Sequence, residues 1–265
     1  MPYDTRIRPS RPSKKFIARK TAGRLLAVLL ASCGLILASC NGSSPSDAPD
    51  TNDESSAISL LPKNVQDAIN GDKSTMTQEL KNSLAFMGNE ERLAYDLYNA
   101  LHKQFPSLNV LNNIARNSEY RHIAAVQLLV RKYIYDENDF TNVDLSPLGY
   151  KDVGIPDMQP GIYDIKAIQS LYDTLYAKGL NSERDALEVG CMVEVTDVND
   201  LNEKIEMAQN SDAEDIETVF NFLREGSYRH YWAFDQALKG RGITGGCCSL
   251  GNINGVNYCH NEYPK

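Results

Sequence analysis

Acidic and histidine side chains recur at helical spacing along four segments of this 265-residue chain. In chain order these residues are Glu91, Glu119, His122, Glu194, Asp197 and His230. Each lies on or beside an apolar stripe, where a hydrophobic residue is expected. A buried, unpaired carboxylate or imidazole is costly, and a bound cation is one of the few ways to offset that cost. Because carboxylate and imidazole ligands suit Fe, Mn and Zn, the pattern predicts a metal site between helices.

The elements that position these residues are predicted from apolar residues at steps of three and four. They indicate long helices over residues 76–103, 108–133, 183–208 and 212–239. Short loops join the first helix to the second and the third to the fourth, so each pair is expected to be an antiparallel hairpin. The long connection between the hairpins holds one further short helix, over residues 163–178. The expected fold is therefore all-α, a ferritin-like four-helix bundle with a long crossover between helices 2 and 3.

The segments that carry the acidic and histidine residues resemble a known family. Their order (Glu, Glu-x-x-His, Glu, His) is similar to the di-iron carboxylate proteins of the ferritin and rubrerythrin type. The stretches NIARNSEYRHIAAVQLLVRKY and LREGSYRHYWAF resemble more closely a bacterial ferritin-like family catalogued as a domain of unknown function. The resemblance covers Met76–Leu238. It implies iron, one or two ions per chain, and a peroxide-reducing or ferroxidase-type reaction, with Mn or Zn as alternative metals. It assigns the ligands to Glu91, Glu119, His122, Glu194 and His230.

One position departs from the pattern of that family. The fourth helix is expected to read Glu-x-x-His, but Ser227 lies three residues before His230. A serine hydroxyl is a poor iron ligand. Either Asp197 or Glu225 substitutes for the missing carboxylate, or the second metal binds weakly or not at all.

Other interpretations remain open at this point. In a metal-free structural bundle, the acids would form internal salt bridges with arginines. The candidates are Arg92, Arg116, Arg121 and Arg229. A non-catalytic metal-binding or partner-binding module, tethered to a membrane, is the alternative to a non-haem iron oxidoreductase. Aromatic residues also gather near the proposed site, and one tyrosine is expected to orient a ligand or carry electrons, with plain core packing as the alternative. They are Tyr95, Tyr98, Tyr120, Tyr228, Tyr231 and Trp232.

The N-terminal region, residues 1–39, has the composition of a bacterial lipoprotein signal peptide. It carries eight Lys or Arg and one acid, followed by the apolar stretch Leu25–Ala38, which is too short to span a bilayer. The sequence Leu-Ala-Ser-Cys at residues 37–40 resembles a lipobox, which implies a lipid on Cys40. An envelope location is expected, in the outer membrane or facing the periplasm. A plain signal peptide and a membrane-spanning anchor are the alternatives.

Residues 40–74 are rich in Ser, Asp, Asn, Pro and Gly, and are expected to form a flexible tether. Ile58–Ile69 is the exception, since it has enough apolar residues for a docking helix. The helical domain is expected over residues 75–240. Without residues 1–39 the chain has 19 basic and 34 acidic residues, a balance that argues against nucleic-acid binding. Metal ions, a membrane reached through the lipid anchor and a second copy of the chain are the expected partners.

Cysteines define the C-terminal tail, residues 241–265. In an oxidising compartment we expect Cys259 to pair with Cys248 or Cys247, with Cys248 preferred. A zinc site of three cysteines with His260 is the alternative. Cys191 is expected to be a buried, apolar free thiol. One tail cysteine is then left over and is expected to be available to another chain.

Overall fold

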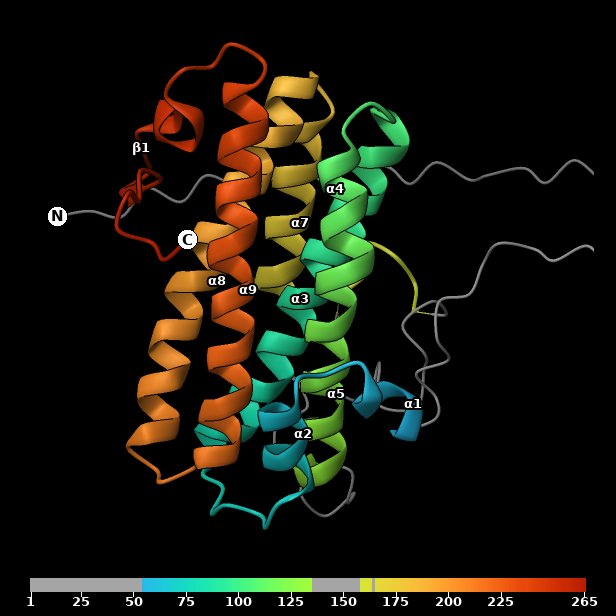
Figure 1. Cartoon of the computed structure of the whole chain (residues 1–265), viewed down its shortest axis with the longest axis vertical. Helices are drawn as coiled ribbons and strands as arrows, with labels where there is room; N and C mark the ends of the chain where they lie inside the picture. Colours follow the sequence, from blue (N-terminus) through green and yellow to red (C-terminus); the bar gives the residue numbers. More distant parts are fainter. Residues whose placement is uncertain (1–53, 135–157, 164) are drawn as a thin grey trace, which may run out of the picture. The chain divides into compact units, whose positions relative to one another are not determined.

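A computed structural model describes residues 54–134, 158–163 and 165–265 of the chain. All of them lie in the second of two compact units, Asp47–Lys265, and this unit is all-α (Figure 1). The predicted signal peptide, the lipid attachment at Cys40 and the first part of the tether lie outside the described residues. Among the helices that the structure does describe, we find none with the length and hydropathy needed to cross a membrane.

The helices agree with the predicted ranges to within three residues. They are α3 (Gln78–Gln104), α4 (Asn109–Ile114), a π-helical turn η1 (Ala115–Glu119), α5 (Tyr120–Ile134), α7 (Lys166–Gly179), α8 (Glu183–Gln209) and α9 (Glu214–Lys239). Side-chain caps begin two of them: the Thr77 hydroxyl accepts the Leu80 N–H before α3, and Ser182 accepts the Asp185 N–H before α8. The prediction of an all-α fold, with a short helix in the long connection, is confirmed.

The long helices pack side by side. Helix α3 contacts α5 and α8, α9 contacts α8 and α5, and α7 covers α3 and α8 (Figure 1). Their inward stripes form two apolar clusters rather than one. The first includes Met87, Leu129 and Phe220, and the second includes Leu97, Leu187 and Phe234. Between these clusters each long helix carries polar residues, which lie at one level of the fold.

The structure corrects the expectation of a tether over residues 40–74. Residues 54–70 form α1 (Glu54–Ser59) and α2 (Lys63–Asn70), and these helices contact α5 and α9. The residues that bury them recur every four positions: Ala57, Leu61, Val65 and Ile69. This narrow stripe is enough to dock a short amphipathic helix, although the average composition of the segment is polar. The alternative of a docking helix within Ile58–Ile69 describes α2 better.

The connection before α7 is held by α3. Arg92 donates to the carbonyl oxygens of Gln159 and Ile162, at 3.2 and 3.0 Å. Asp96, one turn later, accepts from the Gly161 N–H at 3.0 Å and from the Tyr163 hydroxyl at 2.8 Å. Arg92 therefore holds the crossover connection in place and does not pair with the central acids.

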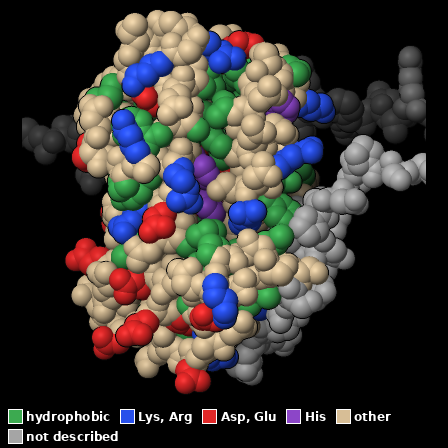
Figure 2. Space-filling model, viewed as in Figure 1, with side chains coloured by type: hydrophobic (Ala, Val, Ile, Leu, Met, Phe, Trp, Pro, Cys, Tyr) green, Lys and Arg blue, Asp and Glu red, His purple; other side chains and the backbone are tan. Residues whose placement is uncertain are grey.

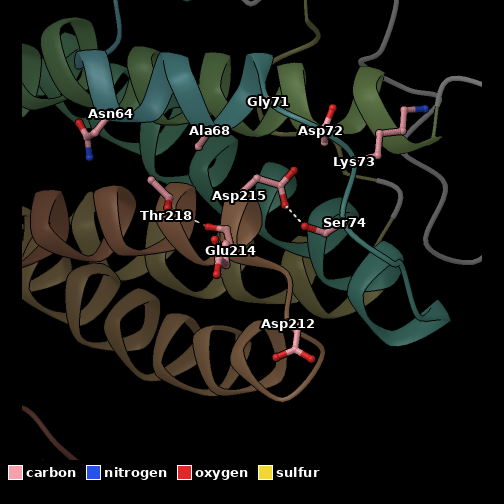
Figure 3. Close-up of a pocket in the computed structure, with 10 residues that line it drawn as sticks. All are labelled: Asn64, Ala68, Gly71, Asp72, Lys73, Ser74, Asp212, Glu214, Asp215 and Thr218. Atoms are coloured by element: carbon pink, nitrogen blue, oxygen red, sulfur yellow. Dashed lines mark hydrogen bonds between the residues drawn. The ribbon is translucent and has the colours of Figure 1, made fainter.

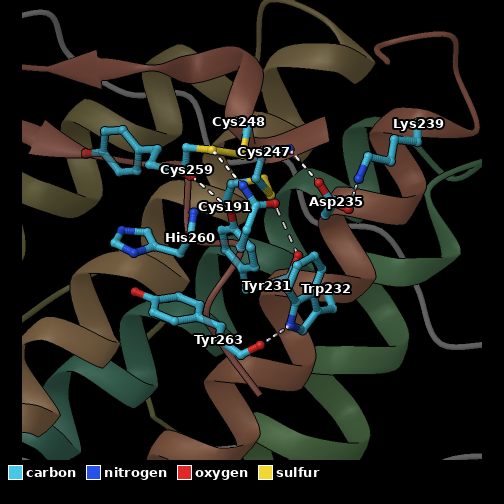
Figure 4. A network of polar contacts seen from close by, with 12 residues as sticks. Cys191, Tyr231, Trp232, Asp235, Lys239, Cys247, Cys248, Cys259, His260 and Tyr263 are labelled. Carbon is cyan, nitrogen blue, oxygen red and sulfur yellow. Dashed lines mark hydrogen bonds and ion pairs between the residues drawn. A yellow bond between two sulfur atoms is a disulfide. The ribbon is translucent and has the colours of Figure 1, made fainter. Parts of the chain in front are cut away.

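The tail folds onto the end of α9 and is closed by two disulfides (Figure 4). After a 3₁₀ turn, η5 (Gly246–Leu250), strands β1 (Asn252–Ile253) and β2 (Val256–Asn257) form a two-stranded hairpin. Cys248 pairs with Cys259, as predicted. Cys191 pairs with Cys247, so the predictions of a free Cys191 and of a spare tail cysteine are wrong. With all three tail cysteines in disulfides, the zinc alternative is also wrong.

The second disulfide could not be read from spacing, because its two cysteines are 56 residues apart in sequence. Two further contacts hold the tail near Cys247. The Cys247 N–H donates to Asp235 Oδ1 at 3.0 Å, and the Tyr231 hydroxyl donates to the Tyr258 carbonyl at 3.0 Å. The tail is thus fixed to α8 by a covalent bond and to α9 by hydrogen bonds.

Candidate metal centre

The polar level between the two apolar clusters contains every residue predicted as a metal ligand. The six side chains come from α3, η1, α5, α8 and α9, and all are buried: Glu91, Glu119, His122, Glu194, Asp197 and His230. Their exposed fractions are at most 5%. The sequence prediction therefore names residues that the fold does bring together.

Five of these residues form two groups of three with ligand atoms close enough for a shared cation. Glu91, Glu119 and His122 make one group, and Glu119, Glu194 and His230 make the other, with ligand atoms within 4.8 Å of one another. Because Glu119 belongs to both groups, the two potential ion positions are adjacent.

The two oxygens of Glu119 face different imidazoles. Its Oε2 lies 3.1 Å from His122 Nδ1, and its Oε1 lies 3.0 Å from His230 Nδ1. His122 Nδ1 is also 3.0 Å from Glu91 Oε2, and His230 Nδ1 is 3.3 Å from Glu194 Oε2. The imidazole rings are roughly parallel, with centroids 5.5 Å apart. Each half of the site thus has one imidazole, one carboxylate of its own and one oxygen of the shared carboxylate.

Glu119 lies in the π-helical turn between α4 and α5. A regular helical stripe through Ala115 predicts Ser118 on the inner face, yet Ser118 is half-buried and Glu119 is almost completely buried. A π turn accommodates one extra residue, so it rotates the following residues around the helix axis. Ala115 and Glu119 are both buried, as residues four apart on one helix face. Glu119 is the last residue of the turn, and His122 follows in α5.

Gly226 is a residue of the site that the sequence analysis missed. On α9 it lies against the His122 ring, and a Cβ atom built there would be 2.3 Å from Nε2. No side chain fits at this position without moving the imidazole. The signal was present in the sequence, since a helical glycine next to Ser227 costs about 1 kcal/mol relative to alanine and needs a packing reason.

Ser227 occupies the position where the family pattern expects a carboxylate. Its hydroxyl donates a hydrogen bond to Asp197 Oδ2, across from α9 to α8. Asp197 Oδ1 has no hydrogen-bond partner among the described residues. Glu225, the other proposed substitute, is exposed on α9. The structure therefore brings Asp197, not Glu225, to the place of the missing glutamate.

The pKa values of these side chains reflect several buried acids that lie close together. Burial raises the pKa of Glu91 well above its ordinary value, and the nearby carboxylates of Asp197 and Glu119 raise it further. Burial also raises the pKa of Asp197, to about 8. The pKa of Glu119 is lowered, because the two imidazoles outweigh its burial. Conversely, Glu119 and Glu194 raise the pKa of His230 despite its burial.

The unpartnered atoms show what the site lacks. Among the described residues, the buried atoms without a hydrogen-bond partner include Glu91 Oε1, Asp197 Oδ1 and His122 Nε2. Arg116, Arg121 and Arg229 are exposed, and Arg92 binds the crossover. Within the part of the chain that the structure describes, no arginine or lysine forms an ion pair with the six predicted ligands, so the salt-bridge alternative is not observed. The donor set fits one or two transition-metal cations.

Tyr98 forms a hydrogen bond with one of the candidate ligands. The buried Tyr98 hydroxyl donates to Glu194 Oε1 and so restrains that carboxylate. By contrast, Tyr228 and Tyr231 pack against Tyr263 of the tail, with ring centroids 4.8 and 5.1 Å apart. Tyr98 therefore has the contact expected of a ligand-orienting side chain.

A second group of acids lines a pocket of about 470 Å³ at the N-terminal end of α9 (Figure 3). Its central acid, Asp215, accepts from Lys132 at 2.6 Å, from Ser74 at 2.7 Å and from the Tyr133 hydroxyl. These donors lower the pKa of Asp215 even though burial acts to raise it. This group joins the segment before α3 to α5 and α9, and its central carboxylate is already neutralised.

The described residues thus form an all-α protein with a buried layer of carboxylates and histidines that can hold a metal. Over residues 80–253 the chain matches the family model described as "Uncharacterized protein domain (DUF2202)", and it belongs to that family. It is 35% identical over 170 residues to "Uncharacterized protein MJ0754" of Methanocaldococcus jannaschii, which covers 64% of this chain and 80% of that protein.

The crystal structure of hypothetical protein MJ0754 is also similar in fold. It shares 32% sequence identity with this chain and gives a TM-score of 0.53, covering 65% of this chain and 86% of the other. The predicted resemblance to a family built on a domain of unknown function is confirmed by these comparisons. Its ferritin-like part is a proposal, taken up next.

Proposed function

We propose that this protein binds two transition-metal ions, with iron as the preferred metal, in the core of a ferritin-like four-helix bundle. The observation that carries the proposal is the position of Glu119. Its two carboxylate oxygens face two imidazoles, and each imidazole has a further carboxylate beside it. A carboxylate shared between two ligand sets on facing helices is the arrangement that a bridged pair of metals requires.

The proposed reaction is oxidation of Fe(II) by peroxide or oxygen, in a non-haem iron oxidoreductase of the peroxidase or ferroxidase type. Bound iron would supply the change in redox state. The side chains of this protein hold and orient the ligands: Tyr98 restrains Glu194, and Ser227 restrains Asp197. The apolar clusters on both sides exclude water, which strengthens electrostatic interactions in the layer.

The number of ions depends on Asp197. Ser227 brings no carboxylate of its own, but its hydroxyl holds Asp197 with one oxygen unpartnered among the described residues. Asp197 thereby supplies the negative charge that the glutamate of the family pattern would bring. We therefore expect both positions to fill rather than one.

We further propose that the protein is a lipoprotein of the bacterial cell envelope, anchored through Cys40, in the outer membrane or facing the periplasm. Support comes from the disulfides Cys191–Cys247 and Cys248–Cys259, since paired structural disulfides are typical of oxidising compartments. Mass spectrometry of the membrane fraction tests this proposal. A mature chain that begins at an acylated Cys40 is expected, and an unmodified Cys40 would contradict it.

Metal content tests the proposed function. The full chain is purified in a mild detergent, without chelator, after growth with added iron. Plasma mass spectrometry is expected to find about two irons per chain. The His122→Ala/His230→Ala variant is expected to lose them while keeping its helical circular dichroism. His102→Ala is the matched control, because His102 is half-buried and contacts the Leu108 carbonyl outside the site.

The outcomes separate the competing functions. Metal in the parent chain and the control, with oxidation of Fe(II) by peroxide, supports the oxidoreductase. Bound metal that does not change redox state with peroxide or oxygen leaves the non-catalytic metal-binding module. A folded parent chain without metal contradicts the metal-binding proposal itself.

A further inference from the structure

The proposed centre is closed to solvent. Its candidate ligands are at most 5% exposed, and apolar clusters lie on both sides of the layer. An ion can reach the layer only by passing between helices. Side chains that bind a cation on the way would therefore lie beside the layer, outside the two ligand groups.

Two carboxylates outside the ligand groups meet these requirements. Glu90 on α3 is 2% exposed, and its Oε2 has no hydrogen-bond partner among the described residues. Asp200 on α8 is half-buried and forms a side-chain hydrogen bond with Glu90. The pair thus connects a buried position on one helix with a partly exposed position on the next.

The inner end of this pair leads to the centre. Asp197 lies on α8 one turn before Asp200, and its charge interacts with Glu90. Asp197 Oδ1 is a second buried oxygen for which the described residues offer no partner. Asp200, Glu90 and Asp197 thus lie along the interface between α3 and α8, and Glu90 interacts with both of the others.

Asp200, the more exposed member of the pair, lies on α8 among other charged side chains. Lys204, one turn after Asp200, interacts with it, and the Lys204 ammonium lies 5.6 Å from the centre of the Phe86 ring. Figure 2 shows Asp and Glu side chains gathered toward the end where α8 joins α9. The exposed acids there are Glu203, Glu206, Asp212 and Glu214. Such a surface raises the local concentration of cations.

We propose that Glu90 and Asp200 form an uptake site, at which a divalent transition-metal ion binds before it passes Asp197 into the two-metal centre. The proposal rests on the proposed function, because it needs a centre that fills. It assigns a role to two buried or half-buried carboxylates that belong to neither ligand group. Their effect is on the rate of filling and not on the final number of ions.

Cobalt uptake tests the uptake site. Metal-free full chain in mild detergent is mixed with Co²⁺, and filling is followed by visible absorbance in a stopped-flow instrument. In the parent chain the observed rate is expected to saturate as Co²⁺ increases, because an ion binds before it moves inward. In Asp200→Asn and in Glu90→Gln the rate is expected to fall about tenfold and to become proportional to Co²⁺. The final absorbance is expected to equal that of the parent.

Glu79→Gln is the matched control. It removes one carboxylate from the helix that carries Glu90, but Glu79 is exposed in the first turn of α3. Its uptake rate is expected to stay within about twofold of the parent rate, since a solvated surface charge is largely screened.

Each contrary result has a separate meaning. Parental rates in Asp200→Asn and Glu90→Gln overturn the uptake site and leave the proposed function intact. A lower final absorbance in these variants also overturns it, because the residues would then be ligands of the centre. A parent chain that takes up no cobalt overturns the proposed function, and the uptake site with it.

Discussion

Asp215 and the central carboxylates are both buried between helices, yet their surroundings differ. Asp215 receives hydrogen bonds from Lys132, Ser74 and Tyr133, and its pKa is lowered. In the central layer, Glu91 and Asp197 have raised pKa values, and each keeps one oxygen for which the described residues provide no donor. The fold thus supplies donors to Asp215, the acid that joins structural segments, and leaves the central acids without them among the described residues.

The comparison separates two uses of a buried acid. A structural acid such as Asp215 finds all its charge and hydrogen-bond partners within the polypeptide, so replacing it is expected to destabilise the fold. A metal ligand keeps an uncompensated charge when its cation is absent. Replacing the ligand side chain is therefore expected to stabilise the metal-free protein and to destabilise the metal-loaded protein. Variants of the two regions are therefore expected to have effects of opposite sign on metal-free stability.

Among the substitutions, the largest expected effect on stability is at Asp215. Asp215→Asn removes the charge that pairs with Lys132 at 2.6 Å and leaves that ammonium without its carboxylate. The free energy of unfolding is expected to fall by about 3 kcal/mol, as for other broken buried ion pairs. Urea denaturation followed by circular dichroism measures this change. Iron content per chain is expected to stay at the parental value, and a loss of iron would mean that the two regions are not independent.

Gly226→Ala tests the geometry of the layer. The added Cβ would lie 2.3 Å from His122 Nε2, so the imidazole must move away from its position beside Glu119. We expect a loss of about 1–2 kcal/mol, since overpacking outweighs the better helix propensity of alanine. Iron content is expected to drop by at least half, a loss that plasma mass spectrometry would detect.

Gly240→Ala is the control for that substitution. Gly240 follows α9, and a Cβ there would meet its nearest atom at an ordinary 3.4 Å. Its iron content is expected to equal that of the parent. Normal iron in Gly226→Ala would show that His122 is not held in place by the close approach of α9.

The metal-free protein is also expected to have a pH-dependent stability. Asp197 has an ordinary pKa of 3.8 and a folded pKa of about 8, so between these values the folded state binds more protons than the unfolded state. Stability therefore falls as pH rises through this window. His230, whose pKa is also raised, acts in the same direction. The melting temperature of metal-free chain is expected to be lower at pH 8 than at pH 5.

Asp197→Asn assigns this pH dependence. The variant lacks the titrating carboxyl, so its melting temperature is expected to change less between the two pH values, and at pH 8 to exceed that of the metal-free parent. Scanning calorimetry at both pH values measures the difference. An equal slope in parent and variant would mean that Asp197 carries no excess proton in the folded state.

Much of this arrangement was predictable from sequence, for physical reasons. Long helices with regular stripes, such as α3 and α9, leave a strong periodic signal. The pair Glu119 and His122 is visible because residues three apart share a helix face. The sequence analysis named Asp197 and Glu225 as the two possible substitutes for the carboxylate missing at position 227. The hydrogen bond between Ser227 and Asp197 favours Asp197.

Other features depend on contacts between distant segments and left little local signal. The four apolar residues that dock α1 and α2 are diluted by polar neighbours. The π turn before α5 changes the helical phase, which a regular stripe cannot represent. Cys191 and Cys247 meet only because the tail folds back on α8. Glycine is needed at position 226 because the His122 ring of α5 lies against it, and not because of the residues beside it in sequence.

The central claim is that Glu119 lies between two metal ions held by this layer. Iron K-edge X-ray absorption of the full chain, loaded with Fe(II) and then oxidised, tests it most directly. We predict imidazole scattering from His122 and His230 and a second iron at about 3.5–4 Å from the first. Iron with imidazole ligands but no iron neighbour at that distance would contradict the claim that Glu119 bridges a pair.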